Sequence, residues 1–80
     1  MSIEEIRRYI QHELLNDPAV RIEPDEDLLL SDMLDSLRVM RLVQHLEEQT
    51  GLVVPPEDVT LENFQSLRQI HGYLTRRCES

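Results

Sequence analysis

Apolar side chains recur at helical spacing near the start of the chain. The positions are separated by three and four residues and comprise Ile3, Ile6, Ile10 and Leu14. This period is typical of a helix that buries one face. Ser2 and Glu5 match a capping box, and Asn16-Asp17-Pro18 provides a stop signal. The pattern therefore predicts a helix over residues 3–15.

Two further stretches of the chain carry the same period. Their apolar stripes are Val39, Leu42, Val43 and Leu46 in one, and Leu67, Ile70 and Leu74 in the other, with Phe64 and Tyr73 nearby. For the first, Asp35 is a good N-cap and Thr50-Gly51 a typical stop, so a helix is predicted between them. For the second, Ser66 and Gln69 form another capping box, which predicts a last helix over 67–77 although Gly72 lies inside it.

The connections between these helices differ in length. Residues 16–34 contain two prolines, three consecutive acids and no clear helical period. A connection of this length is unusual in a compact domain, and long loops are often functional. We expect some of its apolar residues to tether it to the core, from Leu28, Leu29, Leu30, Met33 and Leu34. In the later connection, Glu57 to Leu61 are predicted to form one helical turn, followed by an irregular step at Glu62 and Asn63.

These elements predict an all-α fold. It is a small four-helix bundle, with three main helices, a short third helix and a long loop between helices one and two. At 80 residues the chain has room for one ordinary core. We therefore expect a single domain over 1–80, with a flexible tail from about residue 77. Leu, Ile, Val and Phe account for 25 residues, which favours a folded core over a disordered acidic chain.

The net charge of the chain limits the classes of partner that it can bind. Eight arginines, no lysine and 16 acids give a net charge of −8, which argues against nucleic acid and against anionic membrane surfaces. No apolar run is long enough for a membrane span, and the first residues do not resemble a signal peptide. The single cysteine, Cys78, fits a reducing, cytoplasmic setting. A domain this small favours a carrier or an interaction module over an enzyme.

The sequence gives little indication of a metal site or of a catalytic site. His12, His45 and His71 are spread one to a helix without a second ligand four residues on. The acids at 25–27 lack the glycine and glutamate of a calcium-binding EF-hand loop. No arrangement pairs a nucleophile with its base. We therefore expect no metal site and no catalytic residue.

The start of the second helix is the candidate site. On a helical wheel Leu37, Met40, Arg41 and Gln44 lie opposite the apolar stripe. Exposed apolar residues are common singly, but their clustering beside a helix start favours a docking surface. Ser36 lies in the first turn, where a phosphodiester would meet the positive end of the helix dipole. The plainer alternative is that Asp35 and Ser36 only cap the helix.

Asp35-Ser36-Leu37, opening a helix after a long acidic loop, resembles the attachment motif of acyl carrier and peptidyl carrier proteins. The resemblance covers about residues 3–77. Residues 46–58 are similar to the stretch between the second and third helices of these carriers, and residues 60–67 to the approach to the last helix. The motif alone is weak evidence for this resemblance, but the length, acidity and helix order of the chain strengthen it.

The resemblance implies a four-helix bundle and a carrier role. A phosphopantetheinyl transferase would attach 4′-phosphopantetheine from coenzyme A to Ser36, and the thiol of this arm would hold an acyl or aminoacyl group as a thioester. Asp35 matches the acid that engages the transferase's magnesium, and Leu37 matches a docking residue. The expected partners are this transferase, an acyl- or aminoacyl-activating ligase, and downstream transferases or synthases that act on a monomeric carrier.

Two departures from the family pattern are informative. Many carriers have glycine three or four residues before the serine, where this chain has Met33 and Asp32. Carriers of fatty-acid synthesis have a strongly acidic second helix, whereas Arg38 and Arg41 stand here, which favours a dedicated or secondary-metabolic pathway. Ordinary solvated arginines, a carrier of primary fatty-acid synthesis, and an unmodified helical adaptor remain alternatives. The expected partner face comprises Asp35, Leu37, Arg38, Met40, Arg41 and Gln44.

Overall fold

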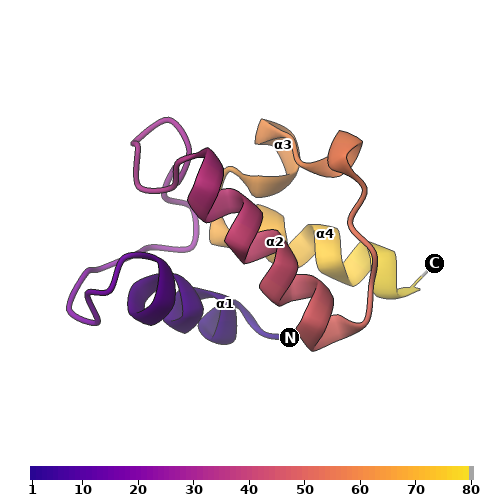
Figure 1. Cartoon of the computed structure of the whole chain (residues 1–80), viewed down its shortest axis with the longest axis horizontal. Helices are drawn as coiled ribbons and strands as arrows, with labels where there is room; N and C mark the ends of the chain where they lie inside the picture. Colours follow the sequence, from indigo (N-terminus) through magenta and orange to yellow (C-terminus); the bar gives the residue numbers. More distant parts are fainter. Residues whose placement is uncertain (80) are drawn as a thin grey trace.

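The computed structural model of the chain, which describes residues 1–79, contains helices and connecting loops, with no strand among those residues. Figure 1 shows the helices α1 (Ile3–Tyr9), α2 (Ser36–Thr50), α3 (Leu61–Phe64) and α4 (Leu67–Glu79). A π-helical turn over Ile10–Leu14 continues α1, and a 3₁₀ turn over Pro56–Asp58 precedes α3. The predicted all-α bundle, with three longer helical segments, a short third helix and a long first loop, is confirmed.

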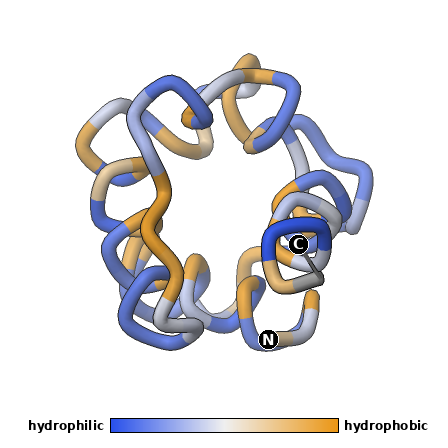
Figure 2. Tube along the Cα trace, turned by 90° about the vertical axis from the view of Figure 1, so that its right-hand side faces the viewer, coloured by the Kyte–Doolittle hydropathy of each residue, from blue (hydrophilic) through white to orange (hydrophobic). Residues whose placement is uncertain are grey.

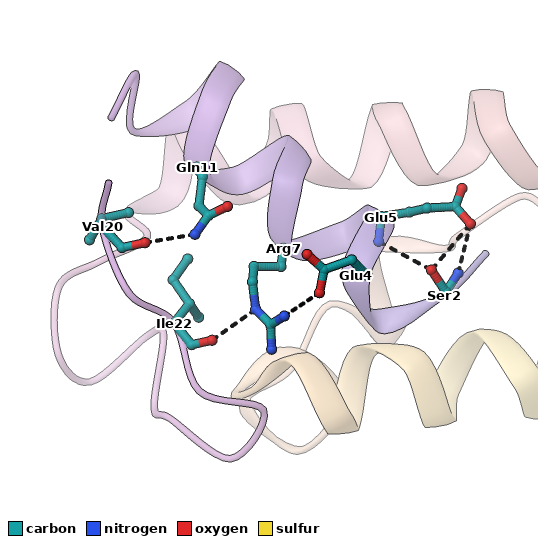
Figure 3. Close-up of polar contacts among 7 residues, drawn as sticks. All are labelled: Ser2, Glu4, Glu5, Arg7, Gln11, Val20 and Ile22. Carbon is teal, nitrogen blue, oxygen red and sulfur yellow. Dashed lines mark hydrogen bonds and ion pairs between the residues drawn. The ribbon is translucent and has the colours of Figure 1, made fainter. Parts of the chain in front are cut away.

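The first helix begins at the predicted capping box. The amide of Glu5 donates to Ser2 Oγ and the amide of Ser2 donates to Glu5 Oε1, each over 3.2 Å (Figure 3). From Ile10 the helix is of the π type, in which an amide bonds to the carbonyl five residues earlier. The amide of Leu15 accordingly donates to the carbonyl of Ile10. Asn16 then takes a left-handed conformation with φ of 52°. Helical structure therefore covers 3–14, close to the predicted 3–15.

The second helix follows the sequence signals closely. The carboxylate of Asp35 accepts from the amide of Arg38 over 2.9 Å at its start, and Gly51 ends it with φ of 74°. Val39, Leu42 and Leu46 are buried, and Val43 is half-buried. The helix is thus held with one face in the core and its first turn at the surface.

The short helical segment before the last helix was predicted only in part. A 3₁₀ turn over Pro56–Asp58 overlaps the helical turn expected over 57–61. The irregular step expected at Glu62 and Asn63 is wrong, because α3 lies there and Thr60 Oγ1 caps it by accepting from the amide of Asn63. The last helix begins at Leu67 as predicted but continues beyond residue 77 to Glu79. Cys78, expected in a tail, lies exposed in its final turn, and Ser80 lies outside the described residues.

One core unites all of these segments. Seen along the long axis, the chain winds around a central region (Figure 2). The buried apolar side chains of these segments form one cluster. The largest fully buried side chains are Phe64, Ile6, Ile10, Leu28, Leu42, Leu46, Leu67 and Ile70. Every α-helix and the long loop contribute to this set, so the loop is part of the core rather than a free connection.

The loop over 16–34 is fixed first against α1. Ile22, which the sequence analysis did not single out, is 2% exposed. Arg7 Nε donates to the carbonyl of Ile22 over 2.9 Å, and Gln11 Nε2 donates to the carbonyl of Val20 over 2.6 Å (Figure 3). Helical side chains thus satisfy loop backbone groups that have no secondary-structure partner.

The second half of the loop is fixed against the start of α4. The amide of Leu28 donates to the carbonyl of Gln65 over 2.7 Å, and the amide of Arg68 donates to the carbonyl of Pro24 over 3.0 Å. The Arg68 guanidinium also makes two hydrogen bonds to the Asp25 carboxylate. Of the expected anchors, Leu28 and Leu34 are buried, Leu29 and Met33 are half-buried, and Leu30 is exposed. These contacts fix the approach to Ser36.

Candidate functional site

Ser36 is the first residue of α2, and its side chain is exposed. Asp35 precedes it as the N-cap, so the serine sits where the helix presents its amide groups and the positive end of its dipole. The core face of α2 begins only at Val39. The hydroxyl is therefore accessible to a large partner without any rearrangement of the core.

A groove of about 600 Å³ adjoins this serine. Its walls come from the end of the long loop, from the first two turns of α2 and from the segment that includes α3; they are lined by Leu29, Asp32, Leu34, Asp35, Ser36, Val39, Met40, Val59, Thr60, Leu61 and Phe64. A second groove of about 610 Å³ shares Met40 and Val59 and reaches Glu47 and Val54. Hollows lined largely by apolar residues thus follow α2 from the serine toward its other end.

The loop wall of the groove is shaped by Asp27. Its Oδ1 accepts from the amides of Leu29 and Leu30 over 3.0 and 2.7 Å, and its Oδ2 accepts from Gln65 Nε2 over 2.8 Å. The hydrogen bond from Gln65, followed by that from the Leu30 amide, lowers the pKa of Asp27 below its usual value because both favour the charged carboxylate. The charged form therefore holds this turn against the junction of α3 and α4.

Asp32 completes the turn in a left-handed conformation, with φ of 62°. Glycine takes this conformation freely, whereas a side chain makes it costly, and aspartate is one of the residues that tolerate it. Asp32 stands four residues before Ser36, which is one of the two positions at which many carrier proteins have glycine. The backbone therefore makes here the kind of turn that glycine permits, and Asp32 is one of the residues that line the groove beside Ser36.

The outward face of α2 matches the prediction. Leu37 and Met40 are 67% and 69% exposed, and Arg41 and Gln44 are also exposed. Leu61 of α3, which sequence reasoning missed, adds a further exposed apolar side chain on the other wall of the groove. The apolar surface near Ser36 therefore extends across two helices.

The two arginines of this helix differ in their surroundings. Arg38 is half-buried, and its Nε donates to the carbonyl of Leu14 over 3.1 Å, with its guanidinium 4.0 Å from the Asp35 carboxylate. This contact joins the end of the first helical segment to the start of α2. Arg41 instead lies on the exposed face of α2, so its charge is accessible at the surface.

Neither a metal centre nor a membrane span is found in the described part of the chain. Across residues 1–79, no group of three or more histidine, cysteine, aspartate or glutamate side chains could hold a metal ion. Within the same residues, no helix has the length and apolar character needed to cross a bilayer. His45 instead stacks on Tyr9, with ring centroids 3.7 Å apart.

Around α2 the structure presents an exposed serine beside a groove, on a small helical bundle. This arrangement is consistent with the class of small helical carrier proteins. The chain belongs to the phosphopantetheine attachment site family, whose model matches residues 4–74. Members of this family carry covalently attached 4′-phosphopantetheine, work with partner enzymes such as ligases and transferases, and are not themselves catalysts.

Two individual proteins illustrate the similarity. The D-alanyl carrier protein of Abiotrophia defectiva is 32% identical over 65 residues, which span 81% of this chain and 82% of that protein. A chain in the solved structure described as "Crystal structure of FAD-dependent dehydrogenase" has a TM-score of 0.78 and 25% identity. The match covers 86% of this chain and 97% of the matched chain.

Proposed function

We propose that Ser36 is the attachment residue of this carrier. Its Oγ attacks the pyrophosphate of coenzyme A, forming a phosphodiester to 4′-phosphopantetheine while the bond to adenosine 3′,5′-bisphosphate breaks and the hydroxyl proton passes to a base of the transferase. The supporting observation is the exposed hydroxyl at the capped start of α2. Asp35 engages the transferase's magnesium, and Leu37 contacts the transferase itself.

The surroundings of Ser36 suit this group. The phosphodiester is an anion, and the positive end of the α2 dipole favours negative charge in its first turn. The groove beside Ser36 offers apolar walls to the uncharged remainder of the arm. When bound, the group supplies the thiol that holds the cargo as a thioester, and the protein supplies only its position.

The proposed cargo is an acyl or aminoacyl group that an ATP-dependent adenylating ligase activates, in a dedicated pathway. Similarity to a D-alanyl carrier protein supports an activated amino acid or a related acid. The partner face is proposed to centre on Met40, Arg41 and Gln44, since their side chains are exposed on α2. A cytoplasmic setting and a monomeric carrier are part of the proposal.

Mass spectrometry tests the attachment directly. Incubation with coenzyme A and a broad-range phosphopantetheinyl transferase should add one phosphopantetheinyl group, and Ser36→Ala should abolish the addition without unfolding the domain. Thr75→Ala is the matched control, because it removes an exposed hydroxyl on α4 that does not line the groove beside Ser36, and it should keep the mass gain. A wild-type protein that stays unmodified while a known carrier reacts would favour the unmodified adaptor.

Charge reversal tests the partner face. Arg41→Glu should weaken transfer of cargo to or from the cognate enzyme more than it weakens phosphopantetheinylation. Arg8→Glu makes the same charge change at an exposed position on α1 and should leave both reactions close to wild type. If Arg41→Glu lowered the rates in both assays equally, Arg41 would not belong to the surface that contacts the cargo enzyme.

A further inference from the structure

Leu30 is an exposed apolar residue that the core does not explain. It was one of the expected anchors of the loop, yet its side chain is 69% exposed. Leu29 and Asp32, which flank it along the chain, both line the groove beside Ser36. Leu30 does not line the groove itself and therefore forms an exposed tip directly beside its loop wall.

The conformation that exposes Leu30 is held by specific contacts. Asp27 Oδ1 accepts from the amide of Leu30 itself over 2.7 Å, and the hydroxyl of Ser31 donates to the carbonyl of Asp27. Asp27 Oδ2 accepts from Gln65 Nε2, which ties the turn to the junction of α3 and α4. The leucine thus projects from a braced turn that is fixed to the body of the domain.

The surroundings of the loop tip indicate the chemistry of what covers it. Asp32 and Asp35 are exposed close to the tip along the chain, and no basic side chain lies between residues 22 and 37. Two other acids of the loop are already paired, Glu23 with Arg21 and Asp25 with Arg68. A protein that covers this tip therefore needs an apolar recess for a leucine side chain, bordered by basic groups that match the acids.

We infer that Leu30 contacts the phosphopantetheinyl transferase, with Asp27 as its positioning residue. The inference rests on the proposed function. The transferase must bring coenzyme A to the Ser36 hydroxyl, so its surface closes over the immediate surroundings of that residue. Leu37 and Met40 provide the α2 side of this surface, and Leu30 provides the loop side. Recognition thereby includes a segment that precedes the attachment motif.

A pair of matched variants tests the contact. Leu30→Asp and Val53→Asp each place a carboxylate at an exposed apolar position, since Val53 is 72% exposed. Val53 follows the end of α2, about 22 Å along the helix from its start. With a broad-range transferase and coenzyme A, Leu30→Asp should lower kcat/KM about tenfold, whereas Val53→Asp should stay within about twofold of wild type. Circular dichroism and thermal melting should be unchanged in both variants.

Separate measurements of KM and kcat test the positioning role of Asp27. Asp27→Ala removes the acceptor for the Leu29 and Leu30 amides, so the leucine loses its fixed position and KM for the carrier should rise severalfold while kcat stays unchanged. Asp27→Asn keeps an oxygen acceptor and should restore most of the affinity. A normal KM for Asp27→Ala would overturn the positioning role.

Failure of this inference can be told apart from failure of the proposed function. If wild type is modified and Leu30→Asp reacts as fast as Val53→Asp, the docking contact is overturned while attachment at Ser36 stands. If wild type is not modified by a transferase that modifies a known carrier, both are overturned. Loss of rate confined to Leu30→Asp supports the contact.

Discussion

Replacing Tyr73 by phenylalanine removes the hydroxyl that joins α4 to the 3₁₀ turn over Pro56–Asp58. The Tyr73 side chain is 4% exposed, and its hydroxyl donates to Asp58 Oδ2 over 2.6 Å. Burial, together with the hydrogen bond to the Asp58 carboxylate, raises the pKa of Tyr73 to about 12. This contact holds the segment whose Pro56 and Val59 line the groove on the far side of Met40.

The expected cost at neutral pH follows from the type of hydrogen bond. A bond to a charged acceptor contributes about 1.5 kcal/mol or somewhat more, and the half-buried Asp58 carboxylate regains some hydration when the hydroxyl is absent. Phenylalanine keeps the ring contact with Phe64, whose centroid lies 5.7 Å away. We therefore expect Tyr73→Phe to lower the free energy of unfolding by about 1.5 kcal/mol at pH 7.

The same hydroxyl makes stability depend on alkaline pH. In the unfolded chain Tyr73 ionises near its ordinary pKa of 10.0, whereas in the folded protein it keeps its proton to about pH 12. The contribution of the Tyr73 hydroxyl to the free energy of unfolding is thus complete below pH 10 and is lost as the pH rises toward 12. Between pH 9 and 11 wild type should lose about 1 kcal/mol on this account, and Tyr73→Phe should lose none of it.

Urea unfolding followed by far-UV circular dichroism measures both effects. The difference between wild type and Tyr73→Phe should be largest at pH 7 and should shrink to less than half by pH 11. Because the chain contains no lysine, few other side chains titrate in this range. Tyr9→Phe is the control, since the Tyr9 hydroxyl makes only a long 3.4 Å contact to the carbonyl of Arg41. Parallel stability curves for wild type and Tyr73→Phe would refute the reasoning.

Four further substitutions, at three positions, test the backbone and can be compared by chemical denaturation. Gly51→Ala should destabilise the protein by about 1 kcal/mol, because φ is +74° there, although no atom lies within 4 Å of the added Cβ. Gly72→Ala should instead stabilise it by about 1 kcal/mol, since the Cβ meets only Arg76 Nη1 at 3.6 Å inside α4; a loss of stability would contradict this placement. Asp32→Gly should match wild type within about 0.5 kcal/mol, and Asp32→Val should lose about 2 kcal/mol, because the left-handed turn excludes β-branched residues.

Local signals explain why α2 was predicted accurately. Its N-cap at Asp35, its apolar stripe and the glycine at its end all lie within the helix or directly beside it, so each can be recognised without knowledge of the fold. The exposed positions of Leu37 and Met40 follow from the same periodicity. The candidate attachment residue was found from such a local motif.

Contacts between distant residues explain what the sequence did not reveal. Ile22 is buried in a stretch without a period, and the bond from Arg7 to its carbonyl joins residues 15 apart. Arg38 was expected on the partner face, but its Nε donates to the carbonyl of Leu14, 24 residues away. The helical conformation at Glu62 and Asn63 was not predicted, because the N-cap that starts it, Thr60, stands among acids and prolines without a helical period.

The bonds that fix the long loop against α4 have a consequence for the order in which the protein is made. Arg68 and Asp25 are 43 residues apart, and Gln65 and Asp27 are 38 residues apart. During synthesis the amino-terminal part emerges first, so Ser36 leaves the ribosome before the residues that hold its loop. The loop can lock only after residues 65–68 have been translated and released from the exit tunnel. A nascent chain therefore displays the serine before it displays the surface around it.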